Sequence, residues 1–233
     1  MELNKRYLSD IPLLALIAAN AVPVLGVLFL EWDAFSLVLL YWAENIVVGF
    51  YNVLKIACAK VPHPLAHLGK LFVIPFFVVH YGGFCAVHGF FVLAMFNKEA
   101  EGVMQAADWP CFFVFVQMLI GVIRHAYSVI PPNMKYAIAA LFISHGVSFV
   151  VNYFVKGEYL TANVKDQMGD PYARVVVLHI AIIAGGFLTM ALGSPVLLLL
   201  VLVVLKTIFD IKLHNRQHKK KQQKPIAETA TPA

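Results

Sequence analysis

The sequence predicts an all-α protein, a polytopic bundle of six or seven transmembrane helices. Of the 233 residues, 61% are hydrophobic and only 13% are charged. A typical soluble domain has about 25% charged residues, so the charged fraction is about half of what solubility would require. The mean hydropathy is +0.77. The apolar residues also gather in runs of about 20, which is the length of helix that crosses the hydrocarbon core of a bilayer.

Seven apolar runs are candidate spans. In chain order they are Ile11–Leu30, Ala34–Cys58, Leu71–Phe96, Cys111–Ile130, Tyr136–Val155, Tyr172–Leu192 and Pro195–Ile211. The last run is the shortest, and Gly193–Ser194–Pro195 either joins two helices or kinks one, so the count stays at six or seven. We expect residues 1–213 to form the helical bundle and residues 214–233 to form a basic tail that is too polar to fold alone.

The segments between these runs have the composition of connections. A short acidic turn follows the first run, two prolines break the chain after the second, and a tight Pro-Pro-Asn turn follows the fourth. The third and fifth runs are followed by longer polar loops. These connections are Glu31–Asp33, Lys60–Pro64, Asn97–Pro110, Pro131–Asn133 and Lys156–Pro171.

The distribution of lysine and arginine indicates the orientation. Basic residues flank the amino terminus and the second and fourth connections, which places all three in the cytoplasm. Helices 71–96 and 136–155 then run outward, and helices 34–58 and 172–192 run inward. Seven crossings would leave the basic tail outside, against the rule, whereas six would not. The tail next to a membrane span is expected to bind anionic lipid headgroups.

Several classes of function are excluded by what the sequence lacks. The basic residues of the tail come without a nucleic-acid-binding motif, so no nucleic acid partner is expected. Three cysteines without a CxxC pair argue against a disulfide framework. No Walker A, Rossmann, HExxH or GxSxG motif occurs. The partner that the sequence does indicate is the lipid bilayer, and a homo-oligomer is compatible with it.

Five ionisable residues inside the apolar runs are candidate site residues. Such groups cost several kcal/mol in a bilayer unless they are paired, so each one points to a function. Counting 1.5 Å per residue along helices of the expected directions gives two levels. The inner level holds Glu44, His80 and His145, and the outer level holds His88 and His179.

Four more polar residues lie close enough to support these two groups. Asn152 is expected at the outer level, and Arg174 at the membrane edge either guides an anionic substrate or reaches for the headgroups. The supporting residues are Asn45, Tyr81, Asn152 and Arg174.

Three chemistries fit these residue types, and a structural role is the fourth alternative. Imidazole and carboxylate suit Zn, Fe or Cu, two facing histidines suit haem b, and a Glu/His chain suits a proton relay in a transporter or channel. Each histidine can instead form only a hydrogen bond between helices. His80 and His88 are about 12 Å apart along one helix, so a metal site needs several helices. We favour a metal or haem site that supports redox or metal-assisted chemistry, and the sequence does not settle whether the protein is an enzyme.

Four stretches resemble a family of bacterial inner-membrane proteins of unknown function. They are YWAENIVVGFYNVLK, HYGGFCAVHGFFV, SHGVSFVVNYF and PYARVVVLHIAIIAGGFL. The Tyr-Trp-x-Glu-Asn and His-Tyr-Gly pieces carry the resemblance, which covers the second to the sixth run. It implies a multi-pass protein of the bacterial inner membrane, and it implies no activity.

Overall fold

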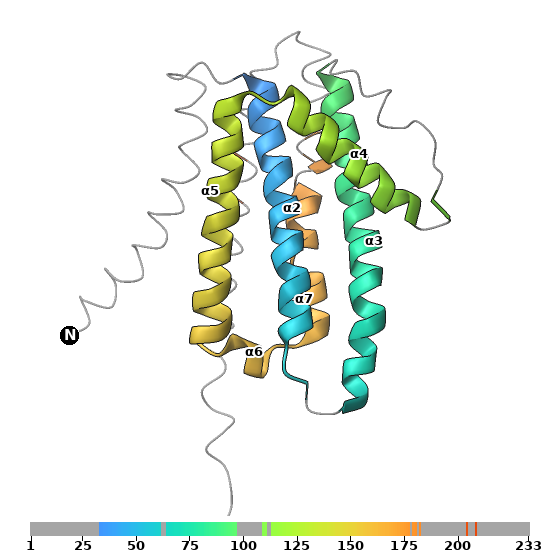
Figure 1. The fold of residues 1–233 in the computed structure, drawn as a ribbon, viewed down its shortest axis with the longest axis vertical. Helices are drawn as coiled ribbons and strands as arrows, with labels where there is room; N and C mark the ends of the chain where they lie inside the picture. Colours follow the sequence, from blue (N-terminus) through green and yellow to red (C-terminus); the bar gives the residue numbers. More distant parts are fainter. Residues whose placement is uncertain are drawn as a thin grey trace, which may run out of the picture.

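The computed structural model describes residues 33–61, 64–96, 109–110, 113–177, 179, 180, 182, 204 and 208. Within these residues every regular element is a helix, so the predicted all-α fold is confirmed for this part of the chain (Figure 1). The predicted span Ile11–Leu30, nearly all of Pro195–Ile211 and the predicted tail 214–233 lie outside the described residues.

The described chain forms six α-helices, one π-helix and a further helical segment. They are α2 (Ala34–Cys58), α3 (Pro64–Met95), α4 (Val114–Val129), α5 (Pro132–Ser148), the π-helix η3 (Phe149–Val155), α6 (Glu158–Thr161), α7 (Val164–Gly169) and residues 172–177, 179, 180 and 182. We call the last of these the 172–182 segment.

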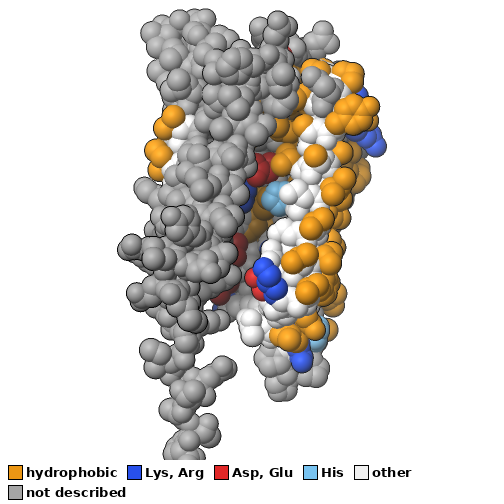
Figure 2. Space-filling view, turned by 90° about the vertical axis from the view of Figure 1, so that its left-hand side faces the viewer, with side chains coloured by type: hydrophobic (Ala, Val, Ile, Leu, Met, Phe, Trp, Pro, Cys, Tyr) orange, Lys and Arg blue, Asp and Glu red, His pale blue; other side chains and the backbone are white. Residues whose placement is uncertain are grey.

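Three stretches of the described helices are long and apolar enough to cross a membrane. They are Phe35–Cys58, His67–Met95 and Met134–Val155. Figure 2 shows hydrophobic side chains along the outer edge of the described helices, with charged and histidine side chains both inward of that edge and near its two ends. The middle of this edge suits lipid contact, because the side chains that face outward there are apolar.

The bounds of α2 are those predicted, whereas α3 begins seven residues earlier than expected. The Asp33 carboxylate accepts a hydrogen bond from the Ser36 backbone N–H at 2.8 Å and caps the start of α2. The two prolines that were expected only to break the chain include Pro64, which is the first residue of α3. Proline is favoured at this position because its missing N–H would have no partner there.

Two long-range hydrogen bonds fix α2 and α3 as antiparallel neighbours. The Trp42 indole N–H donates to the Cys85 carbonyl at 2.7 Å, and the Tyr81 hydroxyl donates to the Asn45 carbonyl at 3.0 Å. At the far end of α2, the buried Lys70 ammonium donates to backbone carbonyls that close that helix. These carbonyls lack helical partners and carry the negative end of the helix dipole, so a lysine stabilises them.

The direction of α5 is the reverse of the expected one. Tyr51 donates to the Phe142 carbonyl at 2.9 Å, and further along both helices the Tyr153 hydroxyl donates to the Lys55 carbonyl. Residue numbers therefore rise together, so α5 and η3 run parallel to α2 and antiparallel to α3. The 172–182 segment likewise runs parallel to α3, because its successive residues contact successive residues of α3.

The length of α4 explains this reversal. The sequence predicted a full span over Cys111–Ile130, but α4 has 16 residues and measures about 24 Å, short of the roughly 30 Å of a hydrocarbon core. It lies obliquely across the second half of α3 (Figure 1). There a Cβ on Gly83 would lie 3.4 Å from Phe115, and one on Gly89 would lie 2.5 Å from Val122. After this oblique helix, α5 runs in the direction opposite to α3 (Figure 1).

The predicted loop after α5 contains α6 and α7, which close the end of the bundle where α2 stops. The Lys60 backbone N–H donates to the Tyr159 carbonyl at 2.8 Å. The buried Asn52 amide donates to the Gln167 carbonyl at 2.8 Å. These bonds join α2 to α6 and α7, and they hold the chain just before the 172–182 segment begins.

Replacement of Gly89 by alanine should destabilise the bundle. The added Cβ would lie 2.5 Å from Val122 and 2.6 Å from the Trp42 ring, so α2, α3 and α4 would have to move apart. Overpacking of this kind costs about 1–3 kcal/mol. The melting temperature of the purified protein in detergent measures this loss of stability. Gly69→Ala on the same helix is the matched control, because a Cβ there meets nothing within 4 Å. Equal melting temperatures for the two variants would contradict the close approach.

Candidate functional site

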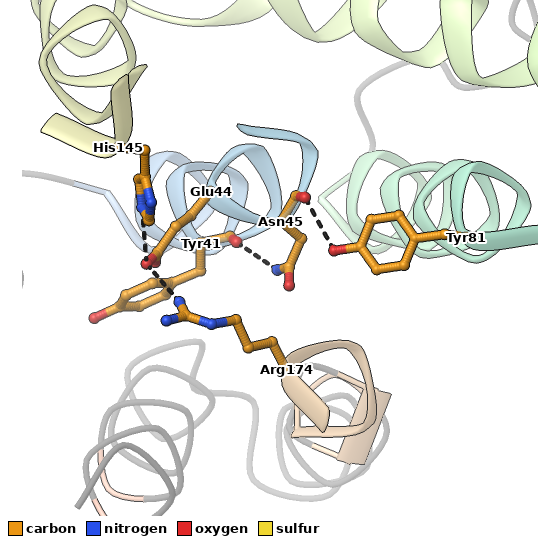
Figure 3. A network of polar contacts seen from close by, with 6 residues as sticks. All are labelled: Tyr41, Glu44, Asn45, Tyr81, His145 and Arg174. Carbon is orange, nitrogen blue, oxygen red and sulfur yellow. Dashed lines mark hydrogen bonds and ion pairs between the residues drawn. The ribbon is translucent and has the colours of Figure 1, made fainter. Parts of the chain in front are cut away.

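Glu44 lies at the centre of an ion-pair network that joins three helical elements. Its Oε1 accepts a hydrogen bond from Arg174 Nη1 at 3.0 Å and lies 3.9 Å from His145 Nε2. The side chains are 16%, 36% and 28% exposed for Glu44, Arg174 and His145. Figure 3 shows the carboxylate between the imidazole from α5 and the guanidinium from the 172–182 segment. We call these three residues the Glu44 centre.

The three members of the Glu44 centre differ in how their charge responds to pH. The arginine keeps its positive charge at every physiological pH. Histidine is the side chain that changes charge near neutrality. The carboxylate therefore lies between a permanent cation and a switchable one. This arrangement lets one proton alter the balance of two competing ion pairs.

A second set of contacts joins the Glu44 centre to α3. The Asn45 side-chain amide donates to the Tyr41 carbonyl at 2.8 Å, and the Asn45 carbonyl accepts from the Tyr81 hydroxyl at 3.0 Å (Figure 3). Asn45 is buried, and its Oδ1 has no hydrogen-bond partner among the residues that the structure describes. A buried acceptor of this kind can take a hydrogen bond from a water molecule or a ligand.

His80 lies at the predicted level but has a partner outside the predicted group. Its neighbour Tyr81 bonds to Asn45, which places His80 at the height of Glu44. However, the His80 Nδ1 is 2.7 Å from the Tyr172 hydroxyl, and its exposed ring stacks on Phe76 at 5.2 Å. The structure therefore brings Glu44 and His145 together as predicted, and it pairs His80 with the 172–182 segment instead.

The two outer histidines are in direct contact, as their shared level suggested. His88 Nε2 lies 2.7 Å from His179 Nδ1, and His88 Nδ1 lies 2.6 Å from the Phe84 carbonyl. His88 is buried, with 3% of its surface exposed, whereas His179 is exposed. The bond to a carbonyl, which only accepts, means that His88 Nδ1 carries a hydrogen and directs Nε2 at His179.

Asn152 does not join the outer histidines. Its amide donates to Ser148 Oγ at 2.9 Å and its Oδ1 accepts from Lys156 at 2.8 Å. It also lies next to Tyr153, which bonds to Lys55 near the end of α2. Because α5 runs opposite to α3, Asn152 lies towards the other end of the bundle from His88. The reversed direction of α5 thus separates residues that the sequence placed at one level.

Two contacts of the site were missed from sequence. Arg174 was read as a residue of the membrane edge, yet it pairs with Glu44. Tyr172 was not among the predicted site residues, yet it binds His80. A signal for the contact of Tyr172 was present in the spacing, because Tyr172 and His179 are seven residues apart and their partners on α3, His80 and His88, are eight apart. Two parallel helices with these spacings face each other through matching turns.

A double-mutant cycle should show that Glu44 and Arg174 depend on each other. Arg174→Ala removes the guanidinium that lies 3.0 Å from the carboxylate, so the single variant should lose about 3 kcal/mol of stability. Adding Glu44→Gln should recover about 1–3 kcal/mol of that loss. Thermal unfolding in detergent measures both. Arg124→Ala, at an exposed arginine on α4, is the control and should have little effect. Additive losses from the two single variants would contradict the pairing.

Comparisons with known proteins confirm one part of the resemblance, membership of a family of unknown function. A family of unknown function, DUF6498, matches residues 2–227, which is nearly the whole chain. No curated protein matches the chain. No solved structure matches it either. The chain therefore belongs to DUF6498, a family of unknown function.

Proposed function

We propose that the protein is a proton-coupled membrane transporter and that the Glu44 centre carries the proton. The observation that supports this proposal is the sharing of one carboxylate by Arg174 at 3.0 Å and His145 at 3.9 Å. Ionisable groups inside membrane helices mark substrate and proton pathways in transporters. The centre is also partly exposed, so a proton can reach it.

The proposed cycle is an exchange of partners at Glu44. With His145 neutral, the carboxylate is paired with Arg174. When His145 takes up a proton, a second positive charge lies about 4 Å from the carboxylate, a gross attraction of about 4 kcal/mol at an effective dielectric constant of about 20. The guanidinium is then released and the 172–182 segment is free to move relative to α2. Loss of the proton restores the Arg174 pair.

The contacts of Glu44 favour this reading over a metal or haem site at the same level. Its nearest described partner is a guanidinium, which has no lone pair to offer a metal. His80, the other expected ligand, is bonded to Tyr172. Among the described residues no group of three or more His, Cys, Asp or Glu side chains is close enough to hold a metal ion. The ion pair therefore gives Glu44 a role that needs no cofactor.

We further propose six membrane crossings in a bacterial inner membrane. Without a full crossing by α4, the remaining candidate spans are Ile11–Leu30, α2, α3, α5, Tyr172–Leu192 and Pro195–Ile211. Six crossings bring the basic tail to the cytoplasmic side, next to the amino terminus and to Lys55, Lys60 and Lys70, as the positive-inside rule requires. The tail can then bind the anionic headgroups of that leaflet.

Reporter fusions test the topology. A cytoplasm-active reporter fused after Ala233 should be active, and one that works only outside the membrane should be inactive. The same pair of reporters inserted between Ile130 and Pro131 should give the opposite result, because α4 begins and ends on the outer side in this arrangement. Reporters at the carboxyl terminus that are active only on the outer side would contradict six crossings.

Proton uptake by vesicles tests the transport proposal. Purified protein reconstituted with a pH-sensitive dye inside should acidify the lumen when the outside pH is lowered. His145→Gln should slow this uptake at least about tenfold, since removing the group that takes up the proton costs about 10² or more in rate. Glu44→Gln should have a similar effect, because it removes the carboxylate that the two cations share.

Glu158→Gln is the matched control, because Glu158 is exposed on α6, away from the Glu44 centre. Infrared difference spectra between about pH 4 and 9 give a second readout, because imidazole and imidazolium have different ring bands. Wild-type vesicles that are no more permeable to protons than empty ones, together with no His145-dependent imidazolium band, would overturn the proposal.

A further inference from the structure

We propose that His88 and His179 form a binding site for a transition-metal ion, separate from the Glu44 centre. Two imidazole nitrogens from different helices, His88 Nε2 and His179 Nδ1, lie 2.7 Å apart. Imidazole is the ligand type that suits zinc, copper, iron and nickel. This pair is not used in the proton exchange at Glu44, and it places two possible ligand atoms from different helices next to each other.

The orientation of His88 is the first argument. Its Nδ1–H donates to the Phe84 carbonyl at 2.6 Å, one turn back along α3. Metal-ligating histidines almost always donate their other ring N–H to a carbonyl or a carboxylate, which fixes the ring and the tautomer. With Nδ1 protonated, the neutral ring has its lone pair on Nε2, which is the nitrogen aimed at His179. The buried ring is thus held ready to ligate.

The separation of the two nitrogens is the second argument. Zinc–nitrogen bonds are about 2.0–2.1 Å, so two imidazole nitrogens on one tetrahedral ion lie about 3.3 Å apart. The observed 2.7 Å is a hydrogen bond that must open by about 0.6 Å to admit the ion. His179 is exposed and can make that movement while His88 stays buried. A haem iron held between the two rings would require about 4 Å, twice a metal–nitrogen bond, and a far larger opening.

Binding of the ion replaces the hydrogen bond between the two histidines. In the metal-free pair one hydrogen lies between the rings, and His179 Nδ1–H donates to His88 Nε2. When the ion binds, the hydrogen of His179 moves to its Nε2, and both nitrogens that faced each other become ligands. The ion completes its coordination with water or a small ligand on the exposed side. Acid should weaken binding, because a protonated imidazole cannot ligate.

Co²⁺ and Zn²⁺ binding to the full-length protein, purified without a histidine tag, tests the site. Elemental mass spectrometry should find about one ion per chain after dialysis against Zn²⁺. Co²⁺ should give visible absorption bands. His88→Gln and His179→Gln should each weaken binding at least about 100-fold, as expected for the loss of one of two protein ligands. His80→Gln is the matched control on the same helix and should bind normally, because its partner is a tyrosine.

A variant that gains a spectroscopic band distinguishes loss of a ligand from loss of the fold, because an unfolded protein would not gain the band. In His179→Cys a thiolate replaces the exposed imidazole, so the Co²⁺ complex should acquire a new sulfur-to-metal charge-transfer band. Absence of Zn²⁺ and Co²⁺ from the wild-type protein would overturn the proposal. Binding that survives both glutamine variants would also overturn it, because the ion would then lie elsewhere, for example at the histidines of the basic tail.

Discussion

The ion pair between Glu44 and Arg174 is the interaction on which the arrangement of this protein depends. A carboxylate within an apolar helix costs several kcal/mol unless an opposite charge satisfies it. Arg174 lies 130 positions later in the chain and contacts it at 3.0 Å. The pairing requires the 172–182 segment to lie against α2, and so requires the chain between them to return to this side of the bundle. The buried charge thus determines which helical elements lie next to each other. Apolar packing alone does not determine this, because lipid tails are as apolar as the helix surfaces.

The contacts around this pair divide the polar residues into two centres. Glu44, Arg174 and His145 form a charged network whose balance depends on one titratable ring. His88 and His179 form an uncharged contact further along α3. The sequence predicted two levels of ionisable residues, with several chemistries open to them. Residues in two places can support two separate chemistries, proton exchange at one and metal ligation at the other.

The sequence predicted the bounds of the helices better than the directions in which they run. The bounds of α2 were correct because an acidic cap and two prolines mark its ends, and the meeting of Glu44 with His145 followed from similar positions within their helices. The direction of α5 was not predictable, because Cys111–Ile130 is as apolar as a span and its composition does not show that α4 has only 16 residues. The role of Arg174 was missed for a related reason. Arginine near a helix end normally reaches for the headgroups, and only the position of Glu44 shows that it turns inward.

The parallel alignment of the 172–182 segment with α3 also has a mechanical consequence. Tyr172, Arg174 and His179 project from one short rod and are attached at three points, to His80, Glu44 and His88. If the 172–182 segment rotated about its axis or slid along it by one turn, all three contacts would break together. A tilt of the segment about one contact would break fewer of them and so would need less free energy. If the guanidinium swings away, the far end of the rod must swing too. Events at the two centres are then linked, and linkage works equally in both directions.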